Sequence, residues 1–227
     1  ECISILEWNA TPRFHKAIEL YLKENPKAKP YFKINATGDR FLTLVPDYQL
    51  NTLLNLMLDE NEYFSKYGIR SLSKQYENKP FTIQINGAEH EVHYKAGESD
   101  TSNFGENSNW RGPIWFPVNY VIIDALLKLK FLTKGKNLDL HLRKEFKNKD
   151  LQDVGKEIIE RLASLFIIKN GQLPIYTEMP EIINNKNLNG LLLFYEYFNG
   201  DNGNGCGASH QTGWTGLIAD LIFKLYD

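Results

Sequence analysis

The segment FPVNYVIIDALLKLKFL, residues 116–132, is apolar nearly all round and decides the fold class. Apolar side chains on every face of a segment this long are typical of a helix packed between other helices. Lys128 and Lys130 mark whatever face remains in contact with water. The segment therefore predicts a mainly helical protein.

Five further segments place apolar side chains at helical spacing and are also predicted to be helices. They span residues 13–24, 46–60, 150–168, 187–198 and 209–226. The first should stop before Asn25-Pro26, because the residue that precedes a proline disfavours helical geometry. The second begins with Pro46, which suits the first turn of a helix.

One segment, residues 80–95, has the pattern of a β-hairpin instead. Phe81, Ile83 and Ile85 alternate with polar residues, and Asn86-Gly87 follows as a two-residue turn. The prediction is thus a mainly α chain of about six helices with a small β-hairpin insertion.

The composition of the 227 residues favours a folded protein with a neutral partner. Hydrophobic residues make up 42% of the chain, which is enough for a substantial core. The 26 basic and 28 acidic residues leave a net charge of −2. This balance argues against nucleic acid and against an anionic membrane as partners.

Cysteines and chain ends bear on cofactors and location. Cys2 and Cys206 show neither a disulfide framework nor the spacing of metal ligands. No apolar run approaches the roughly 20 residues that cross a bilayer. We therefore expect no cofactor, no metal, no membrane and a reducing, cytoplasmic location.

The first residue is Glu1 rather than Met, so we expect a piece of a longer protein.

Three stretches rich in glycine, aromatic and polar residues are not explained by helix periodicity. They lie beside predicted helices, where the loops of a rigid helical scaffold can build a site. They are YGIRSLS (67–73), FGENSNWRGPIW (104–115) and EYFNGDNGNGCGASHQTGWT (196–215).

The middle stretch carries flat rings and hydrogen-bonding side chains that suit a neutral sugar. These side chains are Asn109, Trp110, Arg111 and Trp115. An equally weighted alternative is that the arginine and the amides cap backbone groups while the two tryptophans fill the core.

Glu196 opens the last stretch, at the end of an apolar run that is predicted to be helical. A carboxylate beside aromatic residues can act as a base toward a positioned water, although alone it would more often be a capping or solvated residue.

Residues 200–205, GDNGNG, lack the lysine that follows a P-loop and the glutamate that completes an EF-hand, so they should form a turn. His210 follows Ser209 without a nucleophile elbow, which argues against a serine hydrolase, and we expect His210 to donate a hydrogen bond to a loop carbonyl.

These stretches resemble the carboxy-terminal catalytic domain of glycoside hydrolase family 63, in its glucosidase-like branch. The resemblance covers the chain from about residue 40 to the end, and more weakly its start. It rests on residues 58–62, 67–73, 98–100, 107–120 and 194–215. It implies part of an (α/α)6 barrel, or α/α toroid, that hydrolyses an α-linked glucoside or mannoside with inversion. The chain holds about half of the helices of such a barrel. We therefore expect residues 1–227 to be the C-terminal portion of one domain, completed by the missing upstream half of the same barrel.

The resemblance also implies roles for individual residues. Glu196 matches the base-side carboxylate of the family. Trp110 and Arg111 match residues of its substrate cleft, and Trp214 matches the aromatic that closes its sugar pocket. The candidate residues for binding an oligosaccharide or a small glucoside are Asn109, Trp110, Arg111, Trp115, Asn119, His210 and Trp214.

The acid of the family is an aspartate upstream of these motifs, and no stretch of this chain resembles it. Inversion needs both an acid and a base, so the isolated chain is expected to be nearly inert. Glu98, Glu106 and Asp201 are expected to bind sugar hydroxyls or support loops rather than to act as the acid. The alternative function is a non-catalytic carbohydrate-binding or interaction module.

Overall fold

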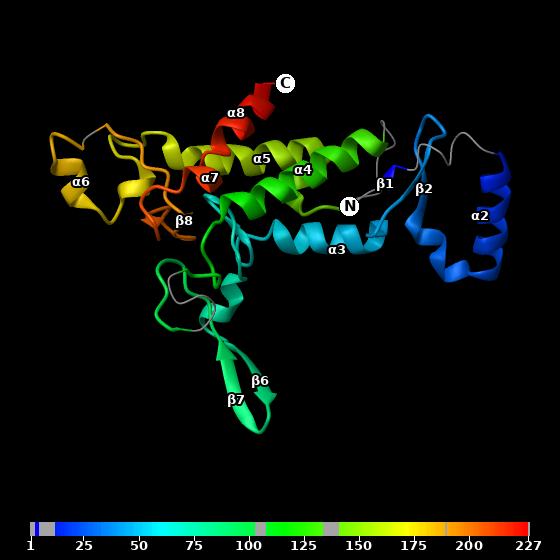
Figure 1. Cartoon of the computed structure of the whole chain (residues 1–227), viewed down its shortest axis with the longest axis horizontal. Coiled ribbons are helices and arrows are strands. Elements are labelled where there is room, and N and C mark those ends of the chain that lie inside the picture. Colours follow the sequence, from blue (N-terminus) through cyan, green and yellow to red (C-terminus); the bar gives the residue numbers. More distant parts are fainter. Residues whose placement is uncertain (1–2, 5–11, 103–107, 134–140, 189, 227) are drawn as a thin grey trace. The chain divides into compact units, whose positions relative to one another are not determined.

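The computed structural model describes residues 3–4, 12–102, 108–133, 141–188 and 190–226. The chain divides into two units, one formed by Glu1–Asn55 and Asp124–Gly155 and the other by Leu56–Ile123 and Lys156–Asp227. The borders between the units fall within three helices, which are α3 (Asp47–Met57), α4 (Phe116–Thr133) and α5 (Leu151–Ala163) (Figure 1). That residues 1–227 make up a single domain stays a prediction.

The first unit combines helices with a small antiparallel sheet in the strand order β1-β3-β2. Besides its parts of α3, α4 and α5, its elements are β1 (Ile3–Ser4), α2 (Pro12–Glu24), the 3-10 helix η1 (Pro26–Tyr31), β2 (Phe32–Ile34), β3 (Arg40–Leu42) and the 3-10 helix η3 (Lys144–Phe146). Its buried core includes Leu126 of α4 with Leu151 and Val154 of α5.

The described part of the second unit contains three two-stranded antiparallel sheets, β4-β5, β6-β7 and β8-β9, among short helices. Besides its parts of α3, α4 and α5, its elements are β4 (Phe64–Ser65), β5 (Gly68–Ile69), η2 (Lys74–Glu77), β6 (Phe81–Ile85), β7 (Ala88–Val92), η4 (Ser164–Phe166), η5 (Pro174–Tyr176), α6 (Pro180–Asn184), β8 (Tyr197–Phe198), β9 (Gly205–Cys206), α7 (Thr212–Thr215) and α8 (Ile218–Tyr226).

In the core of the second unit, the start of α4 packs against β8. Ile114 exchanges backbone hydrogen bonds with Phe198 of β8, at 2.8 and 3.0 Å between nitrogen and oxygen. Phe116 packs edge-on against Phe198 with 5.4 Å between the ring centroids. Ile158 and Leu162 of α5 are fully buried in the same unit. The backbone bonds and the ring contact fix β8 against the start of α4.

Most of the expected elements are confirmed. The apolar segment 116–132 forms α4, residues 13–24 form α2, and residues 46–60 form α3, which ends at Met57. Residues 150–168 form α5 followed by η4. Residues 209–226 form two helices, α7 and α8, rather than one.

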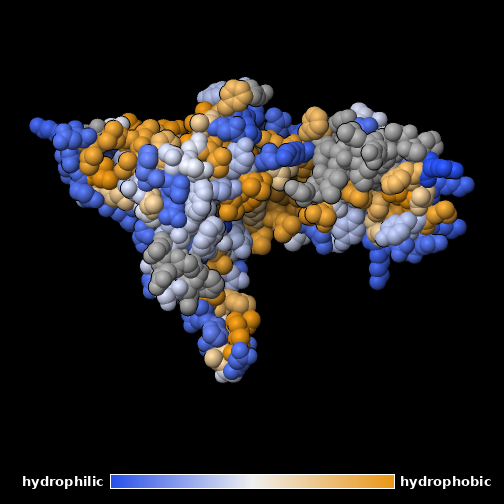
Figure 2. Space-filling model, viewed as in Figure 1, coloured by the Kyte–Doolittle hydropathy of each residue, from blue (hydrophilic) through white to orange (hydrophobic). Residues whose placement is uncertain are grey.

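The hairpin is confirmed at its predicted turn, but its apolar face is not buried. Asn86 and Gly87 both adopt positive φ between β6 and β7. Every residue of β6 is exposed, including Phe81, Ile83 and Ile85. Figure 2 shows hydrophobic residues at the surface of this hairpin.

The predicted helix over residues 187–198 is wrong, because the described part of this segment has no helix and ends in β8. At its C-terminal end the backbone bonds to other segments. The nitrogen of Glu196 donates to the carbonyl of Ala208 at 2.9 Å, and that of Phe198 donates to Ile114. The turn at residues 200–202, expected from GDNGNG, folds the chain back on itself and makes the bond between Glu196 and Ala208 possible.

The structure thus agrees with a partial helical domain that also carries small sheets. That this domain belongs to an (α/α)6 barrel stays a prediction.

Candidate functional site

The candidate site lies in the second unit, at the open end of the hairpin β8–β9. Tyr197 pairs with Cys206 and Phe198 with Gly205. Glu196 directly precedes β8, and its backbone continues the pairing to Ala208. The side chain of Glu196 is therefore carried by a paired, ordered segment, and it is only partly buried.

The Glu196 carboxylate is held by two hydrogen bonds. The Ser108 hydroxyl donates to Oε1 at 3.0 Å, and the backbone nitrogen of Ala208 donates to Oε2 at 3.1 Å. Each oxygen has further lone pairs that can accept a proton or a hydrogen bond from a water molecule. A carboxylate that is held in place and still reachable from solvent can serve as a general base.

Gly207 makes this geometry possible. Its φ is +68°, a conformation that favours glycine. A Cβ at this position would lie 2.6 Å from the Tyr197 ring and 2.7 Å from Oε2 of Glu196. The backbone of residue 207 can therefore approach the carboxylate only because it bears no side chain.

A column of aromatic rings starts at Tyr197, the residue that follows Glu196. Trp110 stacks on Trp115 with ring centroids 3.9 Å apart and planes within 3° of parallel. Trp115 stacks in turn on Tyr197 at 4.6 Å, and Trp214 tilts against Trp115 at 5.4 Å. Trp115 is fully buried, whereas Trp110 is 42% exposed. The column thus ends in a solvent-facing indole.

Asn109 and Asn119 bind the chain itself. The Asn109 amide donates to the carbonyls of Lys95 and Gly97, at 2.8 and 2.6 Å, and accepts from the nitrogen of Arg111 at 3.0 Å. Asn119 donates to the carbonyl of Ile69 and accepts from its nitrogen. Both asparagines are buried, so their amides hold the backbone of neighbouring segments and do not face solvent.

Arg111 also lies within the fold. Its guanidinium forms an ion pair with Asp100 and approaches Nε2 of His93 at 3.1 Å. The hydrogen bond from Arg111 lowers the pKa of the Asp100 carboxyl to about 2. The arrangement ties residues 93–100 to the loop that carries Trp110.

His210 is exposed and faces a backbone donor. The nitrogen of Phe194 donates to Nδ1 of His210 at 3.5 Å, a long hydrogen bond. For this ring nitrogen, the expected donation to a loop carbonyl is therefore wrong, because it accepts instead. The ring packs edge-on against Phe194, at 5.8 Å between centroids.

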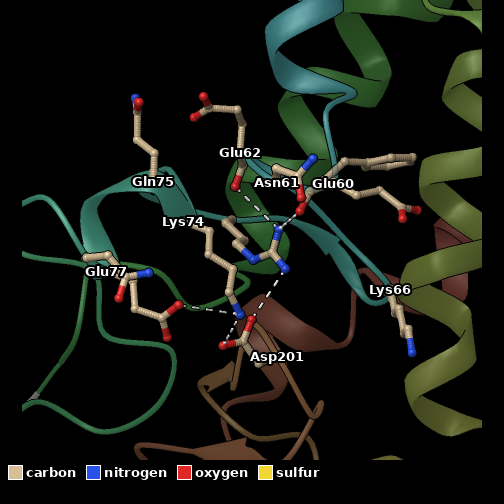
Figure 3. Close-up of a pocket in the computed structure, with 11 residues that line it drawn as sticks. Glu60, Asn61, Glu62, Lys66, Lys74, Gln75, Glu77 and Asp201 are labelled. Atoms are coloured by element: carbon tan, nitrogen blue, oxygen red, sulfur yellow. Dashed lines mark hydrogen bonds and ion pairs between the residues drawn. The ribbon is translucent and has the colours of Figure 1, made fainter.

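A separate polar pocket of about 650 Å³ lies at the tip of β8–β9 (Figure 3). The Lys74 ammonium and the Asp201 carboxylate point toward each other there, at 2.9 Å. Arg70 and the Tyr94 hydroxyl reach the same carboxylate at 3.3 and 3.0 Å. Burial raises the pKa of Asp201, but the hydrogen bonds from Lys74 and Tyr94 and the charges of Lys74 and Arg70 outweigh it and leave that pKa below its ordinary value. These ion pairs anchor the tip of the hairpin, while Glu196 lies at its other end.

Two contacts of the site were not assigned from the sequence, the hydroxyl of Ser108 and that of Tyr197. Both residues lie within the quoted stretches, and Tyr197 is next to Glu196, but no spacing rule identifies their partners. The Tyr197 hydroxyl donates to Oε2 of Glu98 at 2.7 Å. Glu106, considered with Glu98 and Asp201, lies outside the described residues.

Among the described residues no group of three or more His, Cys, Asp or Glu could hold a metal ion. Burial raises the pKa of the Cys206 thiol to about 12, so it is a packing residue. In the part of the chain that is described, no helix is long and apolar enough to span a membrane.

Comparison with known proteins finds a family match over residues 41–161, to the glycosyl hydrolase family 63 C-terminal domain. An uncharacterized protein of Saccharomyces cerevisiae is 42% identical over 192 residues, which is 82% of this chain and 17% of the relative. A probable mannosyl-oligosaccharide glucosidase of Schizosaccharomyces pombe is 26% identical over 85% of this chain and 19% of its own length. The mannosyl-oligosaccharide glucosidase of Saccharomyces cerevisiae is 26% identical over 80% of this chain and 16% of its own length. The chain thus spans less than a fifth of each of these relatives.

Proposed function

Because this chain belongs to glycosyl hydrolase family 63, we propose that it supplies the base side of an inverting α-glycosidase site, with Glu196 as general base. Two of the relatives are named as glucosidases that act on a mannosyl-oligosaccharide. The proposed substrate is accordingly an α-linked glucoside at the end of an oligosaccharide. The acid is proposed to come from sequence upstream of this chain.

The observation that carries the proposal is the setting of Glu196. Its two oxygens accept hydrogen bonds from Ser108 and from the backbone of Ala208, at 3.0 and 3.1 Å. These contacts restrict the carboxylate to one orientation, as a base that activates one particular water requires. In an inverting glycosidase this water attacks the sugar carbon from the face opposite the leaving oxygen.

Sugar binding is proposed for the exposed end of the aromatic column. The outer indole, Trp110, offers a flat face, and stacking on Trp115 fixes its plane. A pyranose ring presents C–H groups that pack on such a face. Trp214, which leans on the same column, is proposed to close the pocket. In this proposal Asn109, Arg111 and Asn119 hold the loops and do not contact the sugar.

A second function, carbohydrate binding without catalysis, is favoured by the exposure of Trp110 and requires no acid. The two functions differ in their dependence on Glu196. The test uses the protein that carries this chain at its natural length, a panel of α-glucosides and α-mannosides, and the variant Glu196→Gln. A general base typically contributes about 10²- to 10⁴-fold to the rate, so the variant is expected to lose activity in this range.

The stereochemistry of the first product tests inversion directly. Proton NMR of early hydrolysis should show the β-anomer released from an α-glucoside. Appearance of the α-anomer first would rule out inversion. If the intact protein bound the sugars but hydrolysed none of them, the binding function would replace the catalytic one.

A further inference from the structure

The carboxylate of Glu98 binds the same short piece of backbone as that of Glu196. The nitrogen of Gly207 donates to Oε1 of Glu98 at 2.8 Å. The next nitrogen, that of Ala208, donates to Oε2 of Glu196 at 3.1 Å. Because nitrogens of consecutive residues lie less than about 4 Å apart, the two carboxylates are held at adjacent points of one segment.

Glu98 also binds the residue that follows Glu196. The Tyr197 hydroxyl donates to Oε2 of Glu98 at 2.7 Å. Burial, together with this hydrogen bond, raises the pKa of Tyr197 above its ordinary value, so the phenol stays protonated as a donor. Glu98 therefore contacts the residue that follows Glu196 and the residue that precedes Ala208, whose nitrogen binds the Glu196 carboxylate.

The segment that carries Glu98 is itself attached to the site. The nitrogen of Lys95 donates to the carbonyl of Arg111 at 2.7 Å, and the nitrogen of Gly200 donates to that of Ala96 at 2.9 Å. The Asn109 amide holds the carbonyls of residues 95 and 97. Glu98 thus extends from a supported backbone rather than from an unattached loop.

We propose that Glu98 is a positioning residue that fixes the Glu196 carboxylate through Gly207 and Tyr197. The inference rests on the proposed function, in which Glu196 is the base. Without Glu98 the backbone of residue 207 loses its acceptor and can rotate, and this moves the donor of Ala208 away from Glu196. A displacement of about 1 Å at a reacting group can cost roughly 100-fold in rate.

The test compares four variants of the protein that carries this chain at its natural length, which are Glu98→Gln, Tyr197→Phe, the double variant of both, and the control Glu91→Gln. Glu98→Gln keeps the size of the side chain but replaces one of the two acceptor oxygens with an NH2 donor, so Gly207 and Tyr197 no longer each have an acceptor atom. Its kcat is expected to fall about 10- to 100-fold, with KM changed less than about twofold, because Glu98 acts on the base and not on bound sugar. Glu91 is exposed on β7, and its replacement should leave both constants unchanged.

Tyr197→Phe removes one of the two donors to Glu98 and retains the aromatic stack, so a smaller fall in kcat is expected. The double variant should be no slower than Glu98→Gln alone, because Tyr197 acts through Glu98. A change in KM rather than kcat, or additive losses in the double variant, would overturn the proposal. If Glu98→Gln does not fold, the fall in kcat of Tyr197→Phe still tests the positioning role of Glu98.

Failure of this inference can be told apart from failure of the proposed function. If Glu196→Gln retains full hydrolysis, Glu196 is not the base and the proposed function is wrong. If Glu196→Gln is inactive while Glu98→Gln has a normal kcat, only the positioning role of Glu98 is wrong.

Discussion

Glu98 and Glu196, which are 98 residues apart in sequence, accept hydrogen bonds from the backbone nitrogens of two consecutive residues, Gly207 and Ala208. The geometry of this site therefore depends on the backbone of the returning strand as much as on the carboxylates. A change that moves the backbone of residues 207–208 should disturb Glu196 without touching its side chain.

Gly207→Ala is the simplest such change. The new Cβ would lie 2.7 Å from Oε2 of Glu196, and φ at +68° disfavours any other residue. We expect a loss of more than about 1 kcal/mol in the free energy of unfolding and a fall in kcat of at least tenfold. Urea unfolding and steady-state kinetics measure the two effects.

Gly171→Ala is the matched control for this change. Gly171 has a similar φ of +79°, but a Cβ there would meet no atom within 4 Å. It should cost stability through backbone strain alone and leave kcat unchanged. Equal kinetic effects of the two alanines would contradict a specific role for the backbone at residue 207.

Trp110→Ala should weaken sugar binding while the chain stays folded. Its indole is partly exposed at the end of the column, and a stacking contact is typically worth about 0.5–1.5 kcal/mol, or roughly a 2- to 13-fold change in affinity. Isothermal titration with α-gluco-oligosaccharides measures this change. Unchanged affinity would show that the exposed indole does not contact the sugar.

Trp115→Ala is the contrasting variant for this measurement. Trp115 is buried between Trp110 and Tyr197, so its removal opens a cavity. We expect a loss of about 3–5 kcal/mol in the free energy of unfolding, visible by thermal or urea unfolding. Retained stability would place the indole outside the core.

Asn119→Ala tests whether this candidate residue is structural. Its amide pairs with both the nitrogen and the carbonyl of Ile69, at 2.7 and 3.0 Å in a buried setting. Removing it leaves two buried polar groups without partners, which should cost more than about 2 kcal/mol of unfolding free energy. A stable variant that had lost only sugar affinity would instead support direct substrate contact.

Acidification should weaken the second unit through Asp100. The hydrogen bond from Arg111 lowers the pKa of this carboxyl from 3.8 to about 2 in the folded chain. A carboxyl with a lowered folded pKa contributes stability that is complete above its unfolded pKa and is lost as the pH falls through the folded one. The free energy of unfolding should therefore decline between about pH 5 and pH 2.

Asp100→Asn checks the assignment of this pH dependence. The variant should be less stable than the natural sequence at pH 6 and should lose less stability on acidification. Asp201, whose pKa is also lowered, should account for part of the remaining decline. Parallel pH profiles for the two proteins would show that Asp100 is not responsible.

The sequence by itself determined the elements whose causes are local. The apolar run of α4 and the alternation around Asn86-Gly87 predicted a helix and a hairpin, because these patterns depend on residues close together in the chain. The expected packing of α4 on all sides is wrong, because Val121 and Phe131 are exposed. The same reasoning identified Glu196, Trp110 and their neighbours as a candidate site, through unusual stretches that resemble one family.

The tertiary structure decided how those stretches fold. Residues 191–195 are apolar enough for a helix, yet the chain enters β8, because the nitrogens of Glu196 and Phe198 find acceptors at Ala208 and Ile114. Burial within residues 109–115 also appears only in three dimensions, where Asn109 and Trp115 are buried while Trp110 is exposed. Likewise, only folding brings Glu98 beside Glu196. Hydrogen bonds between residues nearly 100 positions apart leave no periodic trace in a sequence, so this part of the site could be found only in the folded chain.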